Sequence, residues 1–167
     1  MHPAAQEIDE LLKDCEFRRQ RRSGPGGQHR NKVETGVFVK HLPTGIEAAG
    51  TEERSQSKNR AVAIERLRVK LAIEHRAATV SAAPSELWKN RCRGGRISVS
   101  RKHVDFATLL AEVLDALHHS DCDFEPVAER LNCTRSQIVK LLSIDPAALT
   151  QVNRWRAERG QKPLSPR

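Results

Sequence analysis

The sequence contains no tyrosine, and aromatic residues of all kinds make up only 4% of its 167 residues. RNA-binding surfaces that stack bases, such as those of RRM domains and OB-folds, depend on exposed aromatic side chains. No apolar run approaches the ~18 residues of a membrane span, and the polar N-terminal segment lacks the apolar core of a signal peptide. We therefore expect a cytoplasmic protein that has no membrane partner and does not bind RNA by base stacking.

Cysteine is also scarce, and its four copies show neither a CxxC motif nor the paired Cys/His spacing of a zinc finger. Such a set is more typical of reduced thiols than of a disulfide framework. The sequence therefore predicts no metal site.

Positive charge is in excess, with 29 Lys and Arg against 21 Asp and Glu, and it is unevenly distributed. Residues 1–22 are balanced, residues 23–103 carry sixteen basic side chains against seven acidic ones, and residues 104–167 carry eight against nine. A concentrated basic segment is typical of a protein that binds a polyanion such as nucleic acid. The alternative is a solvated basic surface without a partner.

The first half of the chain predicts a small sheet covered by one helix. Residues 15–22 and 33–42 are β-prone, Pro43-Thr44-Gly45 predicts a turn into residues 46–49, and residues 55–76 predict a long helix. The helix presents an apolar stripe and should pack across the strands, because a sheet cannot bury its face alone. The stripe consists of Ala61, Ile64, Leu67 and Leu71.

The last third predicts only helices. Asp105 should cap a helix that ends near Leu117, and a short helix with Pro126 in its first turn should end near Leu131. Thr134-x-x-Gln137 predicts a capping box for a third helix, and Asp145-Pro146 should open a final helix. The whole chain is thus expected to be α+β. The predicted domains are residues 1–80, a basic connector at 81–103, a helical module at 104–160 and a flexible tail at 161–167.

Ala128, Asn132 and Ile138 have the spacing of a helix-turn-helix, which could present Arg135, Ser136 and Lys140 to nucleic acid. The alternative is a helical module that uses this packing for its own stability. We favour the alternative, because the segment has a net charge of −1 and duplex-binding modules are usually basic. A DNA-binding regulator remains a third hypothesis for the function.

A glycine-rich segment, Ser23-Gly24-Pro25-Gly26-Gly27-Gln28, predicts a loop. It lacks the Gly-Lys-Ser/Thr of a P-loop, and no strand-loop-helix unit of the dinucleotide-binding kind surrounds it. We therefore expect no nucleotide cofactor, and no cofactor of any kind. A catalytic triad of Ser23, His29 and Glu34 would need a convergence in space that their spacing does not indicate.

The segment from Ser23 to Lys32 resembles the catalytic GGQ loop of class I peptide chain release factors and codon-independent ribosome-rescue hydrolases. The resemblance continues through His41-Leu42-Pro43-Thr44-Gly45-Ile46 and through Glu53-Arg54-Ser55-Gln56-Ser57-Lys58-Asn59, and it covers about residues 15–77. Arg30 departs from the family, which usually has a small apolar residue there. Asn31-Lys32-Val33 is closer to the rescue hydrolases than to the stop-codon readers.

The resemblance implies hydrolysis of the peptidyl-tRNA ester on the ribosome without codon reading, with Gly26, Gly27 and Gln28 as the catalytic residues. Its implied partners are the large-subunit rRNA at the peptidyl-transferase centre and the P-site peptidyl-tRNA. The alternative is a non-catalytic ribosome- or RNA-binding protein that retains the loop. The RNA contacts that we expect, from the motifs and from the basic connector, are His29, Arg30, Asn31, Lys32, Arg54, Ser55, Gln56, Lys58, Asn59, Arg91, Arg93 and Arg96.

No segment resembles the decoding domain of the stop-codon readers. We therefore expect a monomer in which the helical module and the basic tail hold the chain on the ribosome.

Overall fold

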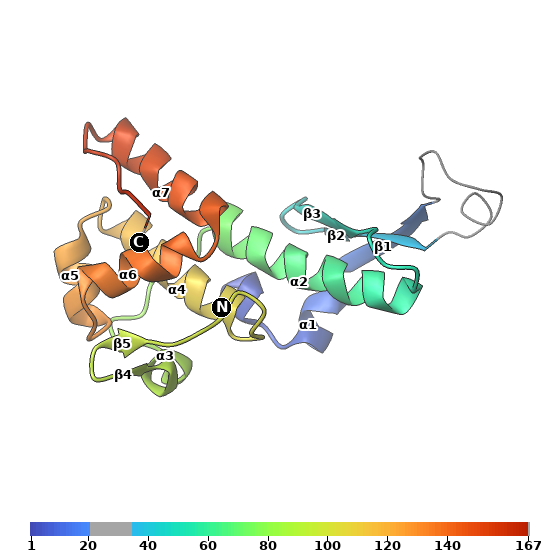
Figure 1. Cartoon of the computed structure of the whole chain (residues 1–167), viewed down its shortest axis with the longest axis horizontal. Coiled ribbons are helices and arrows are strands. Elements are labelled where there is room, and N and C mark those ends of the chain that lie inside the picture. Colours follow the sequence, from blue (N-terminus) through green and yellow to red (C-terminus); the bar gives the residue numbers. More distant parts are fainter. Residues whose placement is uncertain (21–34, 167) are drawn as a thin grey trace. The chain divides into compact units, whose positions relative to one another are not determined.

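In the computed structural model the structure describes residues 1–20 and 35–166. The chain divides into two compact units, Gln6–His75 and a second unit made of Met1–Ala5 with Arg76–Arg167 (Figure 1). The predicted basic connector, residues 81–103, thus lies inside the second unit. The structure is mixed α and β, which confirms the predicted fold class.

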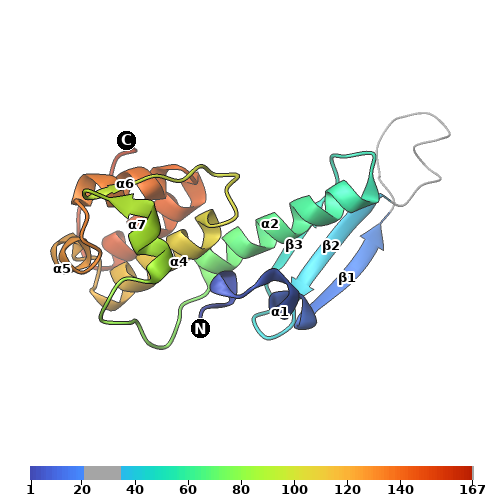
Figure 2. The ribbon, with the colours of Figure 1, turned by 90° about the horizontal axis from the view of Figure 1, so that it is seen from below.

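The first unit is a three-stranded antiparallel sheet with α2 lying along one face (Figure 2). The strand order is β1-β2-β3, and a short helix that the sequence did not predict precedes β1. The elements are α1 (Ile8–Lys13), β1 (Cys15–Gln20), β2 (Gly36–His41), β3 (Glu47–Gly50) and α2 (Gln56–Glu74).

Alternation along β2 determines which face of the sheet is buried. Val37 and Val39 are buried, as Ile64, Leu67 and Leu71 are on α2, whereas Lys40 is only partly covered. The solvent-facing side carries ion pairs from Glu47 to Arg18 and Lys40. This division is typical of an antiparallel sheet with one solvated face. The predicted stripe was wrong at Ala61, which is exposed, while Ala63 is buried.

The second unit is mainly helical, but it also contains a hairpin within the predicted connector (Figures 1 and 2). A helix of six residues precedes the hairpin, where the sequence predicted only a basic connector. The elements are η1 (Pro3–Ala5), α3 (Glu86–Arg91), β4 (Cys92–Arg93), β5 (Arg96–Ile97), α4 (Phe106–His119), α5 (Phe124–Arg130), α6 (Arg135–Ser143) and α7 (Pro146–Glu158).

Most of the predicted helix starts are confirmed by their caps. Thr134 Oγ1 accepts from the Gln137 N–H (3.3 Å), and the Asp145 carboxylate accepts from the Ala147 N–H (3.0 Å) with Pro146 in the first turn. Asp105 was predicted to cap α4, but its side chain makes no capping hydrogen bond. Its carboxylate instead accepts from Arg91 Nε (2.8 Å), which is the stronger, charge-assisted contact.

The core of the second unit lies along α4, whose leucines are almost completely buried. Trp88 of α3 is 1% exposed and donates its Nε1–H to Leu131 O (2.8 Å), so α3 belongs to this core.

The predicted flexible tail is held on α7. Asn153 exchanges two hydrogen bonds with the Leu164 backbone, and Arg156 Nε donates to Lys162 O. The prediction of a free tail was therefore wrong for residues 161–164.

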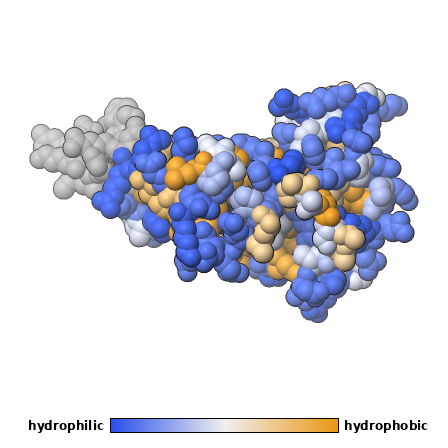
Figure 3. Space-filling model, turned by 180° about the vertical axis from the view of Figure 1, so that it is seen from behind, coloured by the Kyte–Doolittle hydropathy of each residue, from blue (hydrophilic) through white to orange (hydrophobic). Residues whose placement is uncertain are grey.

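Seen from behind, most of the surface is hydrophilic, and apolar side chains gather only in small separate groups (Figure 3). Among the described residues, no helix combines the length and the apolar composition that a bilayer crossing requires. On the face shown, polar chemistry therefore dominates what a partner would contact.

Candidate functional site

The predicted catalytic residues lie outside the part of the chain that the structure describes. Residues 21–34 include Gly26, Gly27 and Gln28, the predicted RNA contacts His29, Arg30, Asn31 and Lys32, and the triad candidates Ser23 and Glu34. The roles assigned to these residues stay predictions. The structure does describe the framework on either side of them.

The two ends of this segment are held next to each other by the sheet. β1 and β2 pair antiparallel in a register that runs from Cys15↔His41 to Gln20↔Gly36. Gln20 and Gly36 are the last paired residues that the structure describes, so the chain leaves the ladder after Gln20 and returns to the same end of it at Gly36. The two strand ends that this segment connects are therefore held in place by the ladder.

Asn59, in the first turn of α2, holds the residue before β2 to the helix. Its side chain is fully buried, and Nδ2 donates to Thr35 O (2.6 Å) and to Glu53 O (2.9 Å). Its Oδ1 accepts from the Glu53 N–H (2.9 Å), so the amide makes three hydrogen bonds. Asn59 thereby joins the residue before β2 to the loop that leads into α2.

The sheet and the helix are in close contact at this point. A Cβ at Gly50 of β3 would collide with the backbone carbonyl of Asn59, so glycine is required for the approach. This placement argues against the predicted RNA contact of Asn59, because its amide is shielded from solvent and fully used. The sequence motif identified the residue but not its role.

The other predicted contacts of this motif surround the start of α2. Ser55 is the N-cap, and its Oγ accepts from the Lys58 N–H (3.4 Å) and contacts Ser57 Oγ. Arg54, Gln56 and Lys58 are exposed. Because Asn59 in the same turn binds Thr35, these side chains lie at the end of the unit where residues 21–34 begin and end.

Further along α2, cations have partners within the unit. Arg60 lies over the Phe17 ring (4.5 Å), and Lys70 Nζ donates to Glu47 O on the edge strand β3 (2.9 Å). Arg66 binds Ala49 O and the Glu52 carboxylate. The pKa of Glu52 falls to about 2, chiefly through the hydrogen bond from the Thr51 N–H and secondarily through Arg66. These cations serve the fold and are poor candidates for RNA contact.

The predicted RNA contacts in the second unit also divide into a cation with a partner in the unit and cations that are exposed. Arg91 is partly buried and forms an ion pair with Asp105 (2.7 Å), so its charge is neutralised within the unit. This placement argues against its predicted RNA role. Arg93 and Arg96 are exposed on the hairpin, so they stay candidates.

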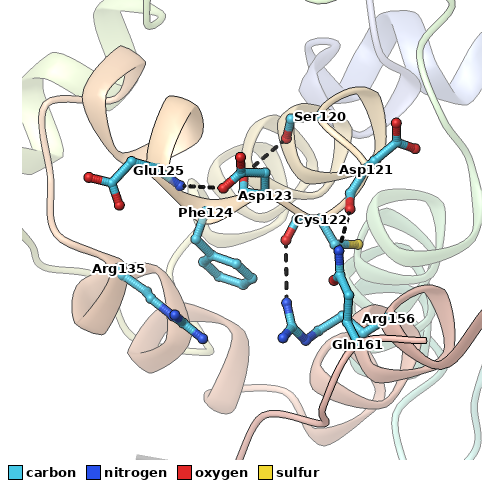
Figure 4. A pocket seen from close by; sticks show the side chains of 9 residues that line it. All are labelled: Ser120, Asp121, Cys122, Asp123, Phe124, Glu125, Arg135, Arg156 and Gln161. Carbon is cyan, nitrogen blue, oxygen red and sulfur yellow. Dashed lines mark hydrogen bonds between the residues drawn. The ribbon is translucent and has the colours of Figure 1, made fainter. Parts of the chain in front are cut away.

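A pocket of about 460 Å³ opens between the start of α5 and the end of α7 (Figure 4). Phe124 lies between the guanidinium groups of Arg135 (5.2 Å) and Arg156 (5.7 Å). Burial raises the pKa of the Cys122 thiol, so the thiol stays protonated at neutral pH and is a weak nucleophile. Asp123 caps α5, and Asp121 pairs with Arg159. The lining residues therefore support the fold and lack an activated catalytic group.

Comparison with known proteins gives matches to a single kind of protein. The model of the family described as the RF-1 domain matches residues 5–106. Peptide chain release factor 1 of Acidiphilium cryptum (strain JF-5) is 44% identical over 86 residues, which are 50% of this chain and 24% of that protein. Peptide chain release factor 1 of Gluconobacter oxydans (strain 621H) is 47% identical over 77 residues, which are 45% of this chain and 22% of that protein. The matched part thus spans about a quarter of these relatives or less.

Proposed function

The chain belongs to the RF-1 domain family, and from this premise we propose that it hydrolyses the ester of peptidyl-tRNA on the ribosome. The reaction is attack of water on the ester carbonyl that joins the nascent peptide to the terminal ribose. A tetrahedral intermediate forms, the ribose oxygen leaves with a proton, and a free carboxyl remains on the peptide.

The proposed catalytic group is the tip Gly26-Gly27-Gln28. Glycines lack Cβ, so the backbone can approach the ester closely and adopt conformations closed to other residues. The Gln28 N–H would stabilise the negative charge that develops in the transition state. The Gln28 amide does not titrate near neutral pH, so it would position the water rather than act as a base.

One observation supports this proposal most directly, and it concerns the base of the loop. Catalysis of this kind requires groups held within a fraction of an ångström of their target. Residues 21–34 connect two paired strand ends, and the fully buried Asn59 holds Thr35 at the point of re-entry. The framework that such a tip requires is therefore built into the first unit.

We further propose that release is independent of a stop codon, as in ribosome rescue. The support is Asn31-Lys32-Val33, which is closer to the rescue hydrolases than to the codon readers. The proposed partners are the rRNA of the peptidyl-transferase centre and the P-site peptidyl-tRNA, with the chain acting as a monomer in the cytoplasm. Among the described residues, Arg54, Gln56 and Lys58 are the proposed contacts of the first unit.

A release assay tests the proposal. Ribosomes that carry labelled peptidyl-tRNA in the P site and an empty A site are mixed with the full chain, and free peptide is measured over time. Loss of one oxyanion donor typically lowers the rate by about 10²–10³, and Gln28→Ala and Gly27→Ala should each have an effect of this order by misplacing the tip. Both variants should still bind ribosomes in a sedimentation assay. Wild-type release no faster than that of the variants would favour the non-catalytic alternative.

A further inference from the structure

The hairpin of the second unit places two arginines directly opposite each other. In the β4–β5 register Arg93 pairs with Arg96, and like charges in opposing positions destabilise a strand pair. The turn between them is Gly94-Gly95, both with positive φ (55° and 73°), as a tight two-residue hairpin turn requires. Within residues 1–20 and 35–166 neither guanidinium has an ion-pair partner. The structure thus holds two positive charges together at an exposed tip.

This tip is fixed to the turn between α5 and α6. The indole of Trp88 donates to Leu131 O, Cys92 Sγ lies 3.8 Å from Asn132 O, and a Cβ at Gly95 would be 4.0 Å from the same carbonyl. Asn132 has a positive φ (47°), as the predicted helix-turn-helix requires. The hairpin and the helix-turn-helix are therefore a single packed assembly (Figures 1 and 2).

Helix α6 continues the cationic surface. Ser136 and Lys140 are exposed, whereas Ile138, Leu141 and Leu142 on the opposite side are buried in the core. Lys140 also borders a small pocket of about 110 Å³, beside the strand residue Ile97 and the residues that follow it. The exposed face of α6 thus adjoins the hairpin.

We propose that the hairpin tip and the exposed face of α6 form a binding surface for duplex RNA. Arg93, Arg96 and Lys140 would contact phosphates, and Ser136 would contact a ribose hydroxyl. Phosphate charge would also relieve the repulsion between the paired arginines, which gives that pairing a function. We call this the hairpin–α6 surface.

The side chains on this surface favour RNA over DNA. Reading a DNA major groove calls for bidentate Arg, Asn or Gln contacts to base edges from the inserted helix. The exposed face of α6 instead offers Ser136 and Lys140, while Gln137 is only partly exposed and Arg135 at its start lies over Phe124. An RNA duplex has a wide, shallow minor groove lined by 2′-hydroxyls, and proteins recognise it by shape and backbone contacts. The short hydroxyl side chain of Ser136, flanked by cations, fits that groove.

As a means of holding the chain on the ribosome, this surface deepens the proposed function and rests on it. Binding to an isolated RNA duplex does not rest on the proposed function, because such binding requires neither the GGQ loop nor hydrolysis. The two proposals can therefore fail separately.

The test is fluorescence anisotropy with the full chain and an RNA duplex of about 16 base pairs, the length that spans two successive minor grooves. Each phosphate contact contributes about 0.9 to the slope of log affinity against log salt for B-DNA, and we take this as the guide for an RNA duplex. Arg93→Gln/Arg96→Gln should therefore weaken binding about 10–100-fold near 0.1 M salt and reduce that slope by about two. Gln28→Ala should bind the duplex as the wild type does.

The matched control removes two exposed charges from the first unit, Lys13 and Arg18, which pair with Glu10 and Glu47. Lys13→Gln/Arg18→Gln should leave affinity and slope unchanged, because these residues lie outside the surface. An equal loss in this control would show that only net charge matters and would overturn the proposal. Equal affinity for a DNA duplex of the same sequence would overturn the assignment to RNA.

Folding of the hairpin variant is checked by thermal unfolding. Replacing two opposed arginines with glutamines removes a like-charge pair, so the melting temperature should stay the same or rise. Lys140→Gln, a second variant outside the hairpin, should by itself reduce the slope by about one. Unchanged RNA binding by both variants would refute the surface.

Discussion

The two units carry basic residues in different settings, and the difference shows which charges remain for a partner. On α2 the cations along the sheet bind backbone carbonyls, an aromatic ring or Glu52, while Arg54 and Lys58 at the first turn are exposed. In the second unit Arg76, Arg91, Arg101 and Arg159 pair with aspartates, while Arg93, Arg96 and Lys140 are exposed. Net charge alone therefore overstates the surface that can bind RNA.

The units also differ in what holds their candidate surfaces in place. In the first unit the buried amide of Asn59 links three segments through hydrogen bonds. In the second unit the hairpin is held by the packing of Trp88 into an apolar core and by its indole hydrogen bond to Leu131 O. Loss of a core side chain usually costs more free energy than loss of a few hydrogen bonds, so the two units should respond differently to substitution.

The largest effect is expected from Trp88→Ala. Removing a buried tryptophan costs about 3–5 kcal/mol of unfolding free energy, and here it also frees the Leu131 carbonyl. Urea unfolding of the second unit can be followed by the fluorescence of Trp155. Trp88→Phe retains most of the volume and should recover most of the loss, whereas equal losses in both variants would mean that the indole hydrogen bond dominates.

Asp115→Ala should be nearly as damaging to the second unit. Its carboxylate is 2.9 Å from Arg76 Nη1 and also accepts from the Ala77 N–H. Breaking a buried ion pair from one side costs about 3–5 kcal/mol, and the partial exposure of Arg76 places this case near the lower end. The measurement is again urea unfolding. The exposed pair of Lys89 and Glu86 is the control, and Glu86→Ala should cost less than about 1 kcal/mol.

Asn59→Ala should destabilise the first unit by about 2 kcal/mol, because buried carbonyls lose their donors. If the amide positions the loop, the release rate at saturating protein should fall further than the fraction folded, while ribosome affinity stays close to that of the wild type. Asn59→Asp keeps the acceptor for the Glu53 N–H but loses both donors, so it should impair release similarly. Normal release by folded Asn59→Ala would remove the positioning role.

The smallest effects are expected from Arg54→Gln and Lys58→Gln, which should leave stability almost unchanged. Each substitution should reduce the slope of log ribosome affinity against log salt by about one, the contribution of one phosphate contact. Arg66→Gln is the matched control on the same helix, because its guanidinium already binds Ala49 O and Glu52. If Arg66→Gln lowered the salt dependence as much as Arg54→Gln, the distinction between paired and exposed cations would not hold.

Local signals in the sequence predicted most of the fold. Ser55, Thr134 and Asp145 act as caps because each cap requires only residues within one helical turn. The sheet, its long helix and the αL turn at Asn132 also follow from short motifs. These features were predictable because their causes are near in sequence.

The sequence predictions were wrong where a residue that is distant in the sequence determines the interaction. Asp105 does not cap α4 because its carboxylate accepts a hydrogen bond from Arg91, which lies fourteen residues earlier. Asn59 was interpreted as an RNA contact because its partner Thr35 is distant in sequence. The tail was predicted to be free, but Asn153 of α7 holds Leu164. The roles of Gly26, Gly27 and Gln28 stay predictions.

The measurement that tests the central claim most directly is peptide release at different codons. Ribosomes with P-site peptidyl-tRNA are programmed with a stop codon, with a sense codon, or with no codon in the A site, and initial release rates are compared for the full chain and Gln28→Ala. The account predicts release without a stop codon, no increase when one is present, and a loss of about 10²–10³ in the variant. Release only at the stop codon, or equal release by Gln28→Ala, would contradict it.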